Sequence, residues 1–314
     1  MPRWLQAFVL AASFASAASL PASAQTPPRT TSPSSTAPQT GDAPLSPAEI
    51  RSRAKILIAN QHADDRAIQE YECVQNQMAR TGGMNPRVLE DKVFRVVPTG
   101  FGPYKILLKQ DGKDVDKEDY RRQLERWEDA LKISLDPSDP RAQDPRTKFE
   151  KKSRDRSDLV DAMEGAFIPH WVGREMRNGY LCDVVQLDPN PQYHARNMFQ
   201  DALSHVIVKL WVDHASNQLV HGEATVTHDI SFGGGIFGKL YRGGVFSMDQ
   251  REFAPGVWLP IRWQYDYTAR KFLFTSEEHE LVEAGQYQRL GSPKQALAVV
   301  EAELAKSEPA HGDP

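Results

Sequence analysis

Four runs between Val206 and Phe274 decide the fold. They are VIVKLWVD (206–213), LVHGEATVTHDI (219–230), VFSMDQREF (245–253) and WLPIRWQYDYTARKFLF (258–274), with the glycine-rich insert FGGGIFGKLYRGG (232–244) between the second and the third. Apolar and polar side chains alternate along these runs, which is typical of strands with one buried face. The pattern predicts an amphipathic antiparallel sheet whose apolar, aromatic face suits the binding of an apolar ligand.

Two of these runs supply the candidate ligand-facing residues. Successive side chains of a strand point to opposite faces, so the even positions of 219–230 share one face, as do the odd positions of 259–267. The candidate cavity residues are Val220, Ala224, Val226, His228, Leu259, Ile261, Trp263, Tyr265 and Tyr267. Rows of this kind line either a filled core or a lipid-sized pocket, because burial alone accounts for both.

The glycine-rich insert predicts a lid over this face. Glycines at 233–235 and 243–244 flank a short apolar segment, and glycine lets a chain either swing or turn tightly. The candidate lid residues are Ile236, Phe237, Leu240 and Tyr241.

The first 24 residues have the features of a secretory signal peptide. A basic start is followed by an apolar, alanine-rich run (4–20) and by the small residues Ala22-Ser23-Ala24. We therefore expect cleavage before Gln25, and a periplasmic or otherwise exported protein that is soluble and has no transmembrane anchor in its mature chain. An uncleaved N-terminal anchor is the alternative, which the short, small-residue run disfavours.

Composition divides the remaining chain into three parts. Residues 25–44 are rich in proline, serine and threonine and lack large apolar side chains, which predicts a disordered linker. Residues 45–306 are predicted to form a single domain, and residues 307–314 a disordered tail. The formal net charge of −4 gives no support for the binding of nucleic acid or of an anionic membrane.

Capped helices are predicted at both ends of the domain. Ser46 with Glu49, and Ser292 with Gln295, each have the spacing of a capping box around a proline at the first helical position. Apolar stripes at helical spacing follow in the first helix (Ile50, Ala54, Leu57, Ile58) and in a middle helix after Asp116 (Tyr120, Leu124, Trp127, Leu131). These stripes are expected to pack against the sheet.

Further strands are predicted over 68–80, 88–97 and 104–110, and in a hairpin over 172–187 that turns at Asn178-Gly179. The polar segment 135–156 is expected to be an exposed excursion that leads into a short helix. Strands and long helices do not alternate regularly, which disfavours a doubly wound parallel sheet. The predicted fold class is α+β: a strongly curved antiparallel sheet, or half-open β-barrel, with helices covering or plugging its concave face.

Catalytic and metal-binding patterns are weak in this sequence. His205, His214, His221 and His228 recur at spacings that invite a metal site, but His221 and His228 face opposite sides of a regular strand and no compact ligand group is formed. The sequence has no Gly-x-Ser-x-Gly elbow of a serine hydrolase. We therefore expect no catalytic residues, no metal and no cofactor, and a protein that is not an enzyme.

The two cysteines leave two readings open. An even number of cysteines in an exported protein favours a disulfide between Cys73 and Cys182. Both lie in predicted strands, where they are equally suited to be small buried thiols.

The order of these features resembles the periplasmic outer-membrane lipoprotein carrier (LolA-like) superfamily, in its lipoprotein-sorting-like branch. The resemblance is carried by the Tyr71 strand and by five segments: YKILLKQDGK (104–113), VGREMRNGYLCDVVQLDPNP (172–191), KLWVDHASNQLVHGEATV (209–226), GGGIFGKLYRGG (233–244) and VWLPIRWQYDY (257–267). It implies a half-open barrel wrapped around helices, with an apolar cavity for acyl chains or other lipids. No ligand-contacting residue of the carriers has a match by motif here.

Together these features predict a periplasmic, non-catalytic binding or carrier protein for a lipid or a lipoprotein acyl chain. The alternative is a sensor or envelope-assembly factor that binds a protein partner through the same fold, as the related sigma-E regulatory domains do. A carrier should have an apolar cavity, and a partner-binding module should have a filled core and an exposed apolar patch.

Overall fold

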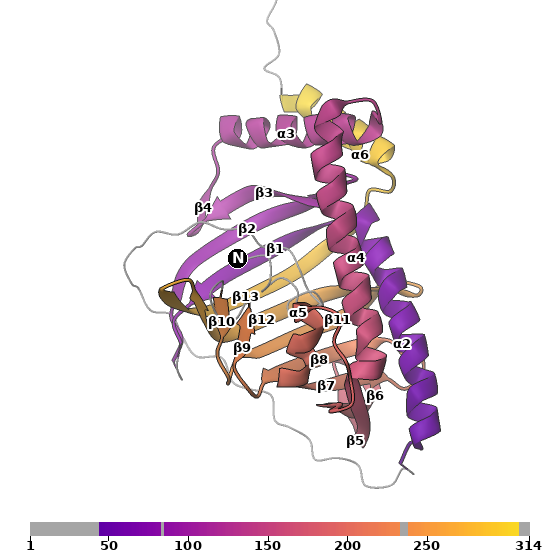
Figure 1. Cartoon of the computed structure of the whole chain (residues 1–314). Coiled ribbons are helices and arrows are strands. Elements are labelled where there is room, and N and C mark those ends of the chain that lie inside the picture. The colour runs from indigo at the N-terminus through magenta and orange to yellow at the C-terminus, as the bar shows by residue number, and fades with distance from the viewer. Residues whose placement is uncertain (1–43, 83–84, 233–237, 308–314) are drawn as a thin grey trace, which may run out of the picture. The chain divides into compact units, whose positions relative to one another are not determined.

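The structure is a computed structural model that describes residues 44–82, 85–232 and 238–307 (Figure 1). The predicted signal peptide, all of the predicted linker except Pro44, and the predicted tail after Ser307 lie outside these residues.

One sheet contains 13 strands, in the order β4-β3-β2-β1-β13-β12-β11-β8-β7-β6-β5, with β10 pairing with β12 and β9. The strands are β1 (Tyr71–Arg80), β2 (Val88–Pro98), β3 (Pro103–Gln110), β4 (Lys113–Asp114), β5 (Phe167–Arg177), β6 (Tyr180–Pro189), β7 (Val206–Asp213), β8 (Leu219–Val226), β9 (Ile230–Phe232), β10 (Gly238–Leu240), β11 (Val245–Ala254), β12 (Val257–Lys271) and β13 (Phe274–Arg289). Neighbours such as β6 and β7, β7 and β8, and β11 and β12 are antiparallel. The end strands β4 and β5 do not pair with each other, so the sheet stays open.

The helices are α2 (Pro47–Ala67), α3 (Lys117–Leu135), α4 (Gln143–Ala166), α5 (Met198–Asp201) and α6 (Pro293–Ser307), with short 3-10 turns at Ile68–Glu70, Pro140–Ala142 and Ala202–His205. Both capping boxes are present. The Glu49 amide donates to Ser46 Oγ and the Ser46 amide to Glu49 Oε2, and Ser292 and Gln295 exchange the same two bonds. The predicted fold class, α+β with a curved antiparallel sheet that does not close, is confirmed.

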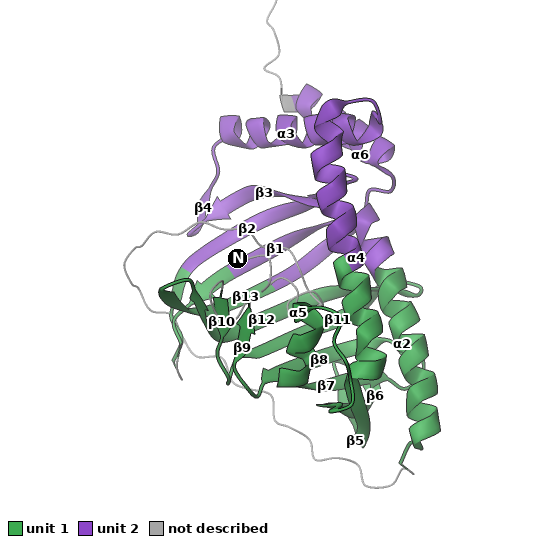
Figure 2. Cartoon of the chain, in the orientation of Figure 1, with its two compact units in different colours: residues 1–64, 78–89, 155–282 green, residues 65–77, 90–154, 283–314 purple. Residues whose placement is uncertain are grey.

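The predicted domain divides into two compact units, drawn in Figure 2: unit 1 (1–64, 78–89 and 155–282) and unit 2 (65–77, 90–154 and 283–314). Unit 2 has its own core, built around Trp127 of α3. The indole nitrogen of Trp127 donates to the carbonyl of Pro98 at 2.8 Å. The buried residues of this core are Val97, Ile106, Leu124, Trp127, Leu131, Leu290, Ala296 and Val300. The stripe predicted for the middle helix is therefore the helix's buried face, with Tyr120 packed at its margin.

A charged cluster joins the helices of unit 2 to its strands. The guanidinium of Arg95 on β2 lies 2.7 Å from a carboxylate oxygen of Glu72 on β1, and 2.7 Å from one of Glu303 on α6. Tyr120 of α3 donates its hydroxyl to the other oxygen of Glu303 at 2.7 Å. Arg95 Nη1 also donates to the Tyr120 hydroxyl at 3.2 Å, so one guanidinium connects two strands and two helices, and its Cζ lies 5.2 Å from the ring centroid of Trp127.

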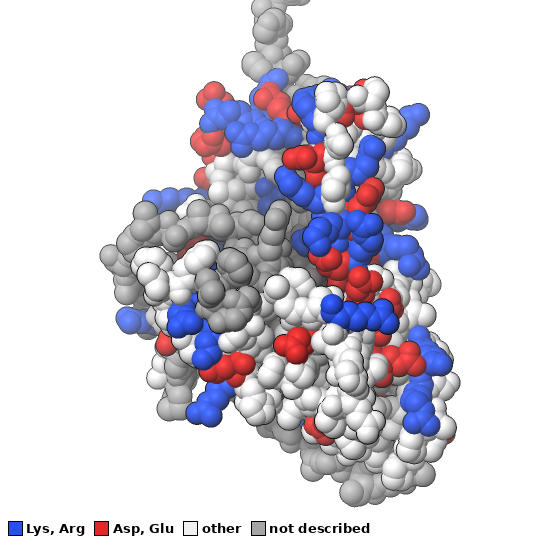
Figure 3. Space-filling model, viewed as in Figure 1, with Lys and Arg blue, Asp and Glu red and all other residues white. Residues whose placement is uncertain are grey.

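Helix α4 replaces most of the exposed excursion predicted over 135–156. Its polar composition suggested a loop, but lysine, arginine and glutamate are good helix formers. Positive and negative side chains are interspersed along it (Figure 3), including an i,i+4 pair in which Lys148 Nζ lies 3.4 Å from Asp144. The segment is a helix with a solvated charged face, and it continues into the apolar turns that carry Leu159 and Met163.

Candidate functional site

Unit 1 contains a cavity of about 520 Å³. Strands β5, β6, β7, β8, β11 and β12 form one side, and α2 and α4 form the other. Every residue that lines the cavity belongs to unit 1. The cavity therefore lies within one compact unit.

The sheet wall is built from rows of directly opposed residues. Leu187, Val208, Ala224, Phe246 and Tyr265 lie opposite one another on consecutive strands, and all five line the cavity. Opposed residues project from the same face of a sheet. A single apolar row therefore crosses the cavity wall from β6 to β12.

A second row runs beside the first. Val185, Leu210, Gly222 and Met248 are opposed in the same way and line the cavity, and Trp263 is opposed to Met248. Gly222 lies between two leucines in this wall. A Cβ atom at Gly222 would lie 3.5 Å from Leu210 Cδ2 and 3.8 Å from Leu219 Cδ2, which are ordinary contacts. The backbone at Gly222 therefore has room for a side chain.

The helix wall is the apolar stripe predicted for the first helix. Ile50, Ala54, Leu57 and Ile58 of α2 line the cavity together with Leu159, Val160 and Met163 of α4. Two polar contacts connect the helices. His62 Nε2 lies 2.9 Å from Asp161 Oδ1, and Lys55 Nζ lies 3.9 Å from Glu164 Oε1. The predicted stripe thus faces a cavity as well as the sheet.

The structure places the candidate cavity residues of β8 in different surroundings. Ala224 lines the cavity. Val226 is buried opposite Val206, a cavity residue, but does not line the cavity itself. Val220 lies in a separate core cluster with Cys182, Val184, Trp211 and Trp258. His228 is exposed beyond the end of β8.

A bulge explains the position of Val220. His221 is opposite Trp211, and Leu219 is opposite the next residue, Val212, so Val220 has no opposite residue on β7. An extra residue of this kind reverses the alternation of the strand from that point. Leu219 therefore lines the cavity where the sequence pattern placed Val220.

The candidate residues of β12 divide in the same manner. Tyr265 lines the cavity, whereas Trp263 and Tyr267 are buried on the same face outside it. Leu259 is fully buried without reaching the cavity. Ile261 lies at an irregularity, because Arg262 is opposite Asp249 while Pro260 is opposite Gln250, and its side chain is half-buried.

Half of the predicted lid lies outside the described residues, namely Ile236 and Phe237. Leu240 is fully buried on β10. Tyr241 is half-buried, its amide donates to the carbonyl of Thr268, and Lys239 Nζ lies 5.1 Å from its ring centroid. Leu240 and Tyr241 do not line the cavity.

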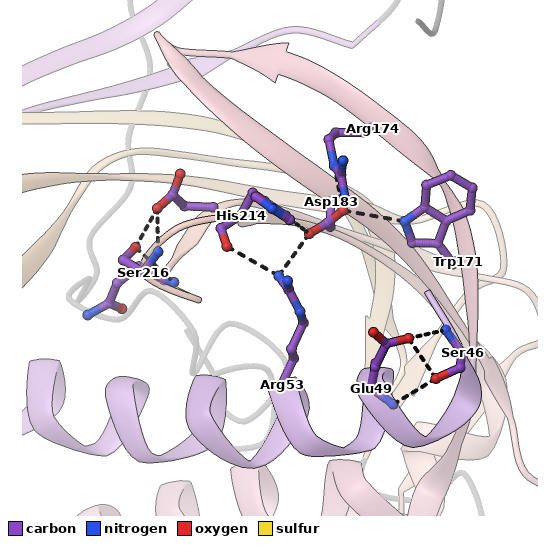
Figure 4. A network of polar contacts seen from close by, with 10 residues as sticks. Ser46, Glu49, Arg53, Trp171, Arg174, Asp183, His214 and Ser216 are labelled. Carbon is purple, nitrogen blue, oxygen red and sulfur yellow. Dashed lines mark hydrogen bonds and ion pairs between the residues drawn. The ribbon is translucent and has the colours of Figure 1, made fainter. Parts of the chain in front are cut away.

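A buried carboxylate lies at one wall of the cavity (Figure 4). Asp183 of β6 has a 1% exposed side chain and accepts hydrogen bonds from Arg53 Nη1 at 2.9 Å, from Arg174 Nε at 2.9 Å and from Trp171 Nε1 at 3.5 Å. His214 Nδ1 lies 2.7 Å from the same carboxylate. Burial raises the pKa of Asp183, but the hydrogen bonds from His214 and Arg174 outweigh it and hold that pKa below its ordinary value.

This network positions α2. Besides the bond to Asp183, Arg53 donates to the carbonyl of His214 at 3.3 Å. Further along α2, Asn60 Nδ2 donates to the carbonyl of Asn217 at 3.1 Å, and the Trp258 amide donates to Asp64 at 2.9 Å. One side of α2 is therefore held by polar contacts to strand ends, while its apolar side faces the cavity. Sequence patterns reveal the apolar side, but they do not show which distant polar group each α2 residue meets.

The four histidines that recur in the sequence do not meet at one site. His214 meets Asp183, and His221 Nδ1 lies 2.8 Å from Asp249 Oδ1. The rings of His205 and His228 have centroids 6.2 Å apart. Among the residues that the structure describes, no group of three or more His, Cys, Asp or Glu side chains is arranged to hold a metal ion.

The two cysteines are both free and buried in the structure, and the disulfide considered from the sequence stays a prediction. Burial raises the pKa of each thiol to about 12. Cys73 belongs to unit 2 and Cys182 to unit 1.

Within the described ranges, no helix has both the length and the apolar character needed to span a membrane.

No family model and no curated protein matches the chain. Solved structures with a similar fold include a DUF1329 family protein from Desulfovibrio piger, at 9% identity and a TM-score of 0.29, covering 76% of this chain and 92% of that one. A putative outer membrane lipoprotein-sorting protein domain from Vibrio parahaemolyticus has 9% identity and a TM-score of 0.30, covering 79% and 99%. A LolA superfamily protein from Nitrosomonas europaea has 10% identity and a TM-score of 0.25, covering 76% and 96%.

Proposed function

We propose that this chain is a periplasmic, non-catalytic binding or carrier protein that holds a lipid or a lipoprotein acyl chain in the cavity of unit 1. The cavity carries this proposal. Its volume of about 520 Å³ lies within the range of roughly 300–1,000 Å³ found for small-molecule sites.

The chemistry of the walls favours an aliphatic ligand. The two opposed rows and the stripe of α2 present leucine, isoleucine, valine and methionine side chains from both sides. Contacts with such residues are non-directional and scale with the apolar area removed from water, which suits a flexible acyl chain. A polar metabolite would require several polar groups that converge on it. Among the charged residues that line the cavity, Arg53 and Asp183 pair with each other, and Glu164 pairs with Lys55.

A second candidate function, a sensor or envelope-assembly factor that binds a protein partner, is supported by a different surface. Val172 and Met176 of β5 and Leu181 of β6 are exposed apolar residues, and Met176 is opposite Leu181. Because β5 is an end strand of the sheet, a partner could cover these side chains.

Uptake of a fluorescent fatty acid tests the carrier proposal, together with mass spectrometry of lipids that co-purify with the native protein. Ala224→Leu should fill part of the cavity and weaken uptake while leaving the unfolding free energy nearly unchanged. Thr225→Val is the matched control, since Thr225 is the adjacent residue on the exposed face of β8 and its replacement should not alter uptake.

Two results together would overturn the carrier proposal. The wild-type protein would take up no probe and carry no lipid, and Ala224→Leu would lose about 1–3 kcal/mol of stability, as expected for an overpacked solid core. Retention of an envelope protein by the wild-type chain, abolished by Met176→Ser, would then favour the partner-binding alternative.

A further inference from the structure

The turn between β12 and β13 presents three consecutive large apolar side chains to solvent. β12 ends at Lys271 and β13 begins at Phe274, so the turn consists of two residues. The exposed fractions are 63% for Phe272, 90% for Leu273 and 81% for Phe274. Single exposed apolar residues are ordinary on a protein surface, but a contiguous exposed group points to an interaction site.

The backbone of this turn provides a second observation. Phe272 has a φ of 54°, in the left-handed region that is unfavourable for most residues and that glycine and asparagine tolerate. Two other tight turns of the chain use tolerant residues there: φ is 51° and 77° at Asp111-Gly112, and 52° and 87° at Asn178-Gly179. A bulky aromatic residue thus occupies a position where the fold alone favours asparagine or glycine. A strained conformation at an exposed position is a reason to look for a function.

Charged residues are ordered along this hairpin. Arg270 and Lys271 directly precede the turn on β12, whereas the first acidic residues after it on β13 are Glu277 and Glu278. Strands rise about 3.3 Å per residue. The carboxylates therefore begin roughly 10 Å or more from the turn, while the two cations lie next to the apolar side chains.

We propose that the β12–β13 hairpin tip docks the protein on an anionic lipid surface. Phe272, Leu273 and Phe274 enter the boundary between headgroups and acyl chains, and Lys271 lies at the level of the lipid phosphates. Interfacial binding of this kind combines apolar side chains buried about 5–10 Å deep with cations that are attracted to anionic lipids. The proposal concerns a surface separate from the cavity and does not depend on what the cavity binds.

The area of the tip favours a membrane over a protein partner. A stable protein–protein interface requires about 800 Å² from each side. Three side chains of this kind supply roughly 500 Å², at the 150–250 Å² typical of an aromatic residue. A lipid surface needs no complementary shape and accepts a narrow tip.

Vesicle co-sedimentation tests this proposal with the chain purified after export. The double variant Phe272→Asn, Leu273→Gly removes the apolar tip and places asparagine at the left-handed φ of Phe272, so the turn should still form. Wild type should bind vesicles of phosphatidylethanolamine and phosphatidylglycerol, and vesicles of phosphatidylcholine more weakly. The affinity of the double variant for the anionic vesicles should be at least about tenfold weaker. Lys271→Glu should lose the preference for the anionic vesicles.

Met176→Ser is the matched control, because Met176 is also 62% exposed beside a hairpin turn and its replacement should leave vesicle binding unchanged. The proposal is overturned if wild type does not bind the anionic vesicles, or if the double variant binds them as well as wild type does. It is also overturned if the variant loses only a concentration-dependent self-association, which would assign the tip to a second copy of the chain. Uptake of the fatty-acid probe should be unchanged in the double variant, so failure of docking and failure of the cavity proposal are distinguishable.

Discussion

The guanidinium of Arg53 lies 2.9 Å from the carboxylate of Asp183 and joins α2 to β6 at the wall of the cavity. Arg174, His214 and Trp171 contact the same carboxylate, so a single buried negative charge is shared by four cationic or hydrogen-bonding partners. The cavity requires α2 to stay at a fixed place although part of its apolar stripe faces empty space. A buried ion pair with several hydrogen bonds is directional, whereas apolar contacts are not, so it fixes the position of α2.

Asp183→Asn should destabilise the protein by about 3–5 kcal/mol, because it leaves the partly buried guanidinium groups of Arg53 and Arg174 without their counter-charge. Urea unfolding measures this loss. Asp161→Asn is the control, since Asp161 also pairs with an α2 side chain, His62, but is 58% exposed. Its loss should cost only about 0–1 kcal/mol. Equal effects of the two variants would mean that Asp183 does not hold α2 in place.

The same carboxylate predicts a dependence of stability on pH. The pKa of Asp183 is lowered in the folded state, so its contribution is present above the unfolded pKa of about 3.9 and is lost as the pH falls through the folded value. The stability difference between wild type and Asp183→Asn should therefore be constant near neutral pH and shrink below about pH 4. Unfolding free energies of both proteins across this range test the sign. A difference that grows on acidification would contradict it.

Arg95→Met should destabilise unit 2 by about 3 kcal/mol, since the carboxylates of Glu72 and Glu303 would lose the cation that lies 2.7 Å from each. Burial raises the pKa of Glu303, but Arg95 and Tyr120 lower it overall. The variant should therefore recover part of its deficit at a pH low enough to protonate Glu303. Arg121→Met is a suitable control, because Arg121 contacts Glu125 on the surface of the same unit. A pH-independent deficit for Arg95→Met would indicate lost packing on Trp127 instead.

Neither thiol should react with an alkylating reagent in the folded protein at pH 8. Cys73 and Cys182 are buried, and burial raises each pKa to about 12, so the reactive thiolate is scarce. After denaturation without a reductant, mass spectrometry should find two alkylated cysteines per chain. A protein that gains no alkyl group under those conditions would contain a disulfide, contrary to the structure.

Regular periodicity made much of this fold predictable. The stripe from Ile50 to Ile58 and the face around Trp127 follow helical spacing, and each faces the interior of its unit. The predicted alternation of buried and exposed side chains does not hold at Val220, where a single bulge moves Leu219 into the cavity wall. A bulge depends on how two strands pair, and one strand's composition does not specify it.

The partners of α2 were unpredictable for a related reason. Arg53 and Asp183 are 130 positions apart in the sequence, and many arginines are equally plausible partners for a carboxylate. The α4 segment was mistaken for an excursion because charged residues with good helix propensity resemble a solvated loop in composition. The sequence therefore indicated which faces are apolar, whereas pairing and register determined which of those faces meet at the cavity.

Gly222→Leu should fill the cavity from its sheet wall. The backbone φ of Gly222 lies outside the left-handed region, and an added Cβ meets only leucine side chains at ordinary distances, so the backbone tolerates a side chain there. Gly222→Ala is the matched control. It should leave probe uptake unchanged and raise stability by about 0.5–1 kcal/mol, because glycine weakens a strand interior. The larger Gly222→Leu side chain, placed between Leu210 and Met248, should weaken uptake strongly without the loss of about 1–3 kcal/mol that overpacking causes. If Gly222→Leu takes up the probe as well as Gly222→Ala does, the probe binds elsewhere and the cavity is not the ligand site.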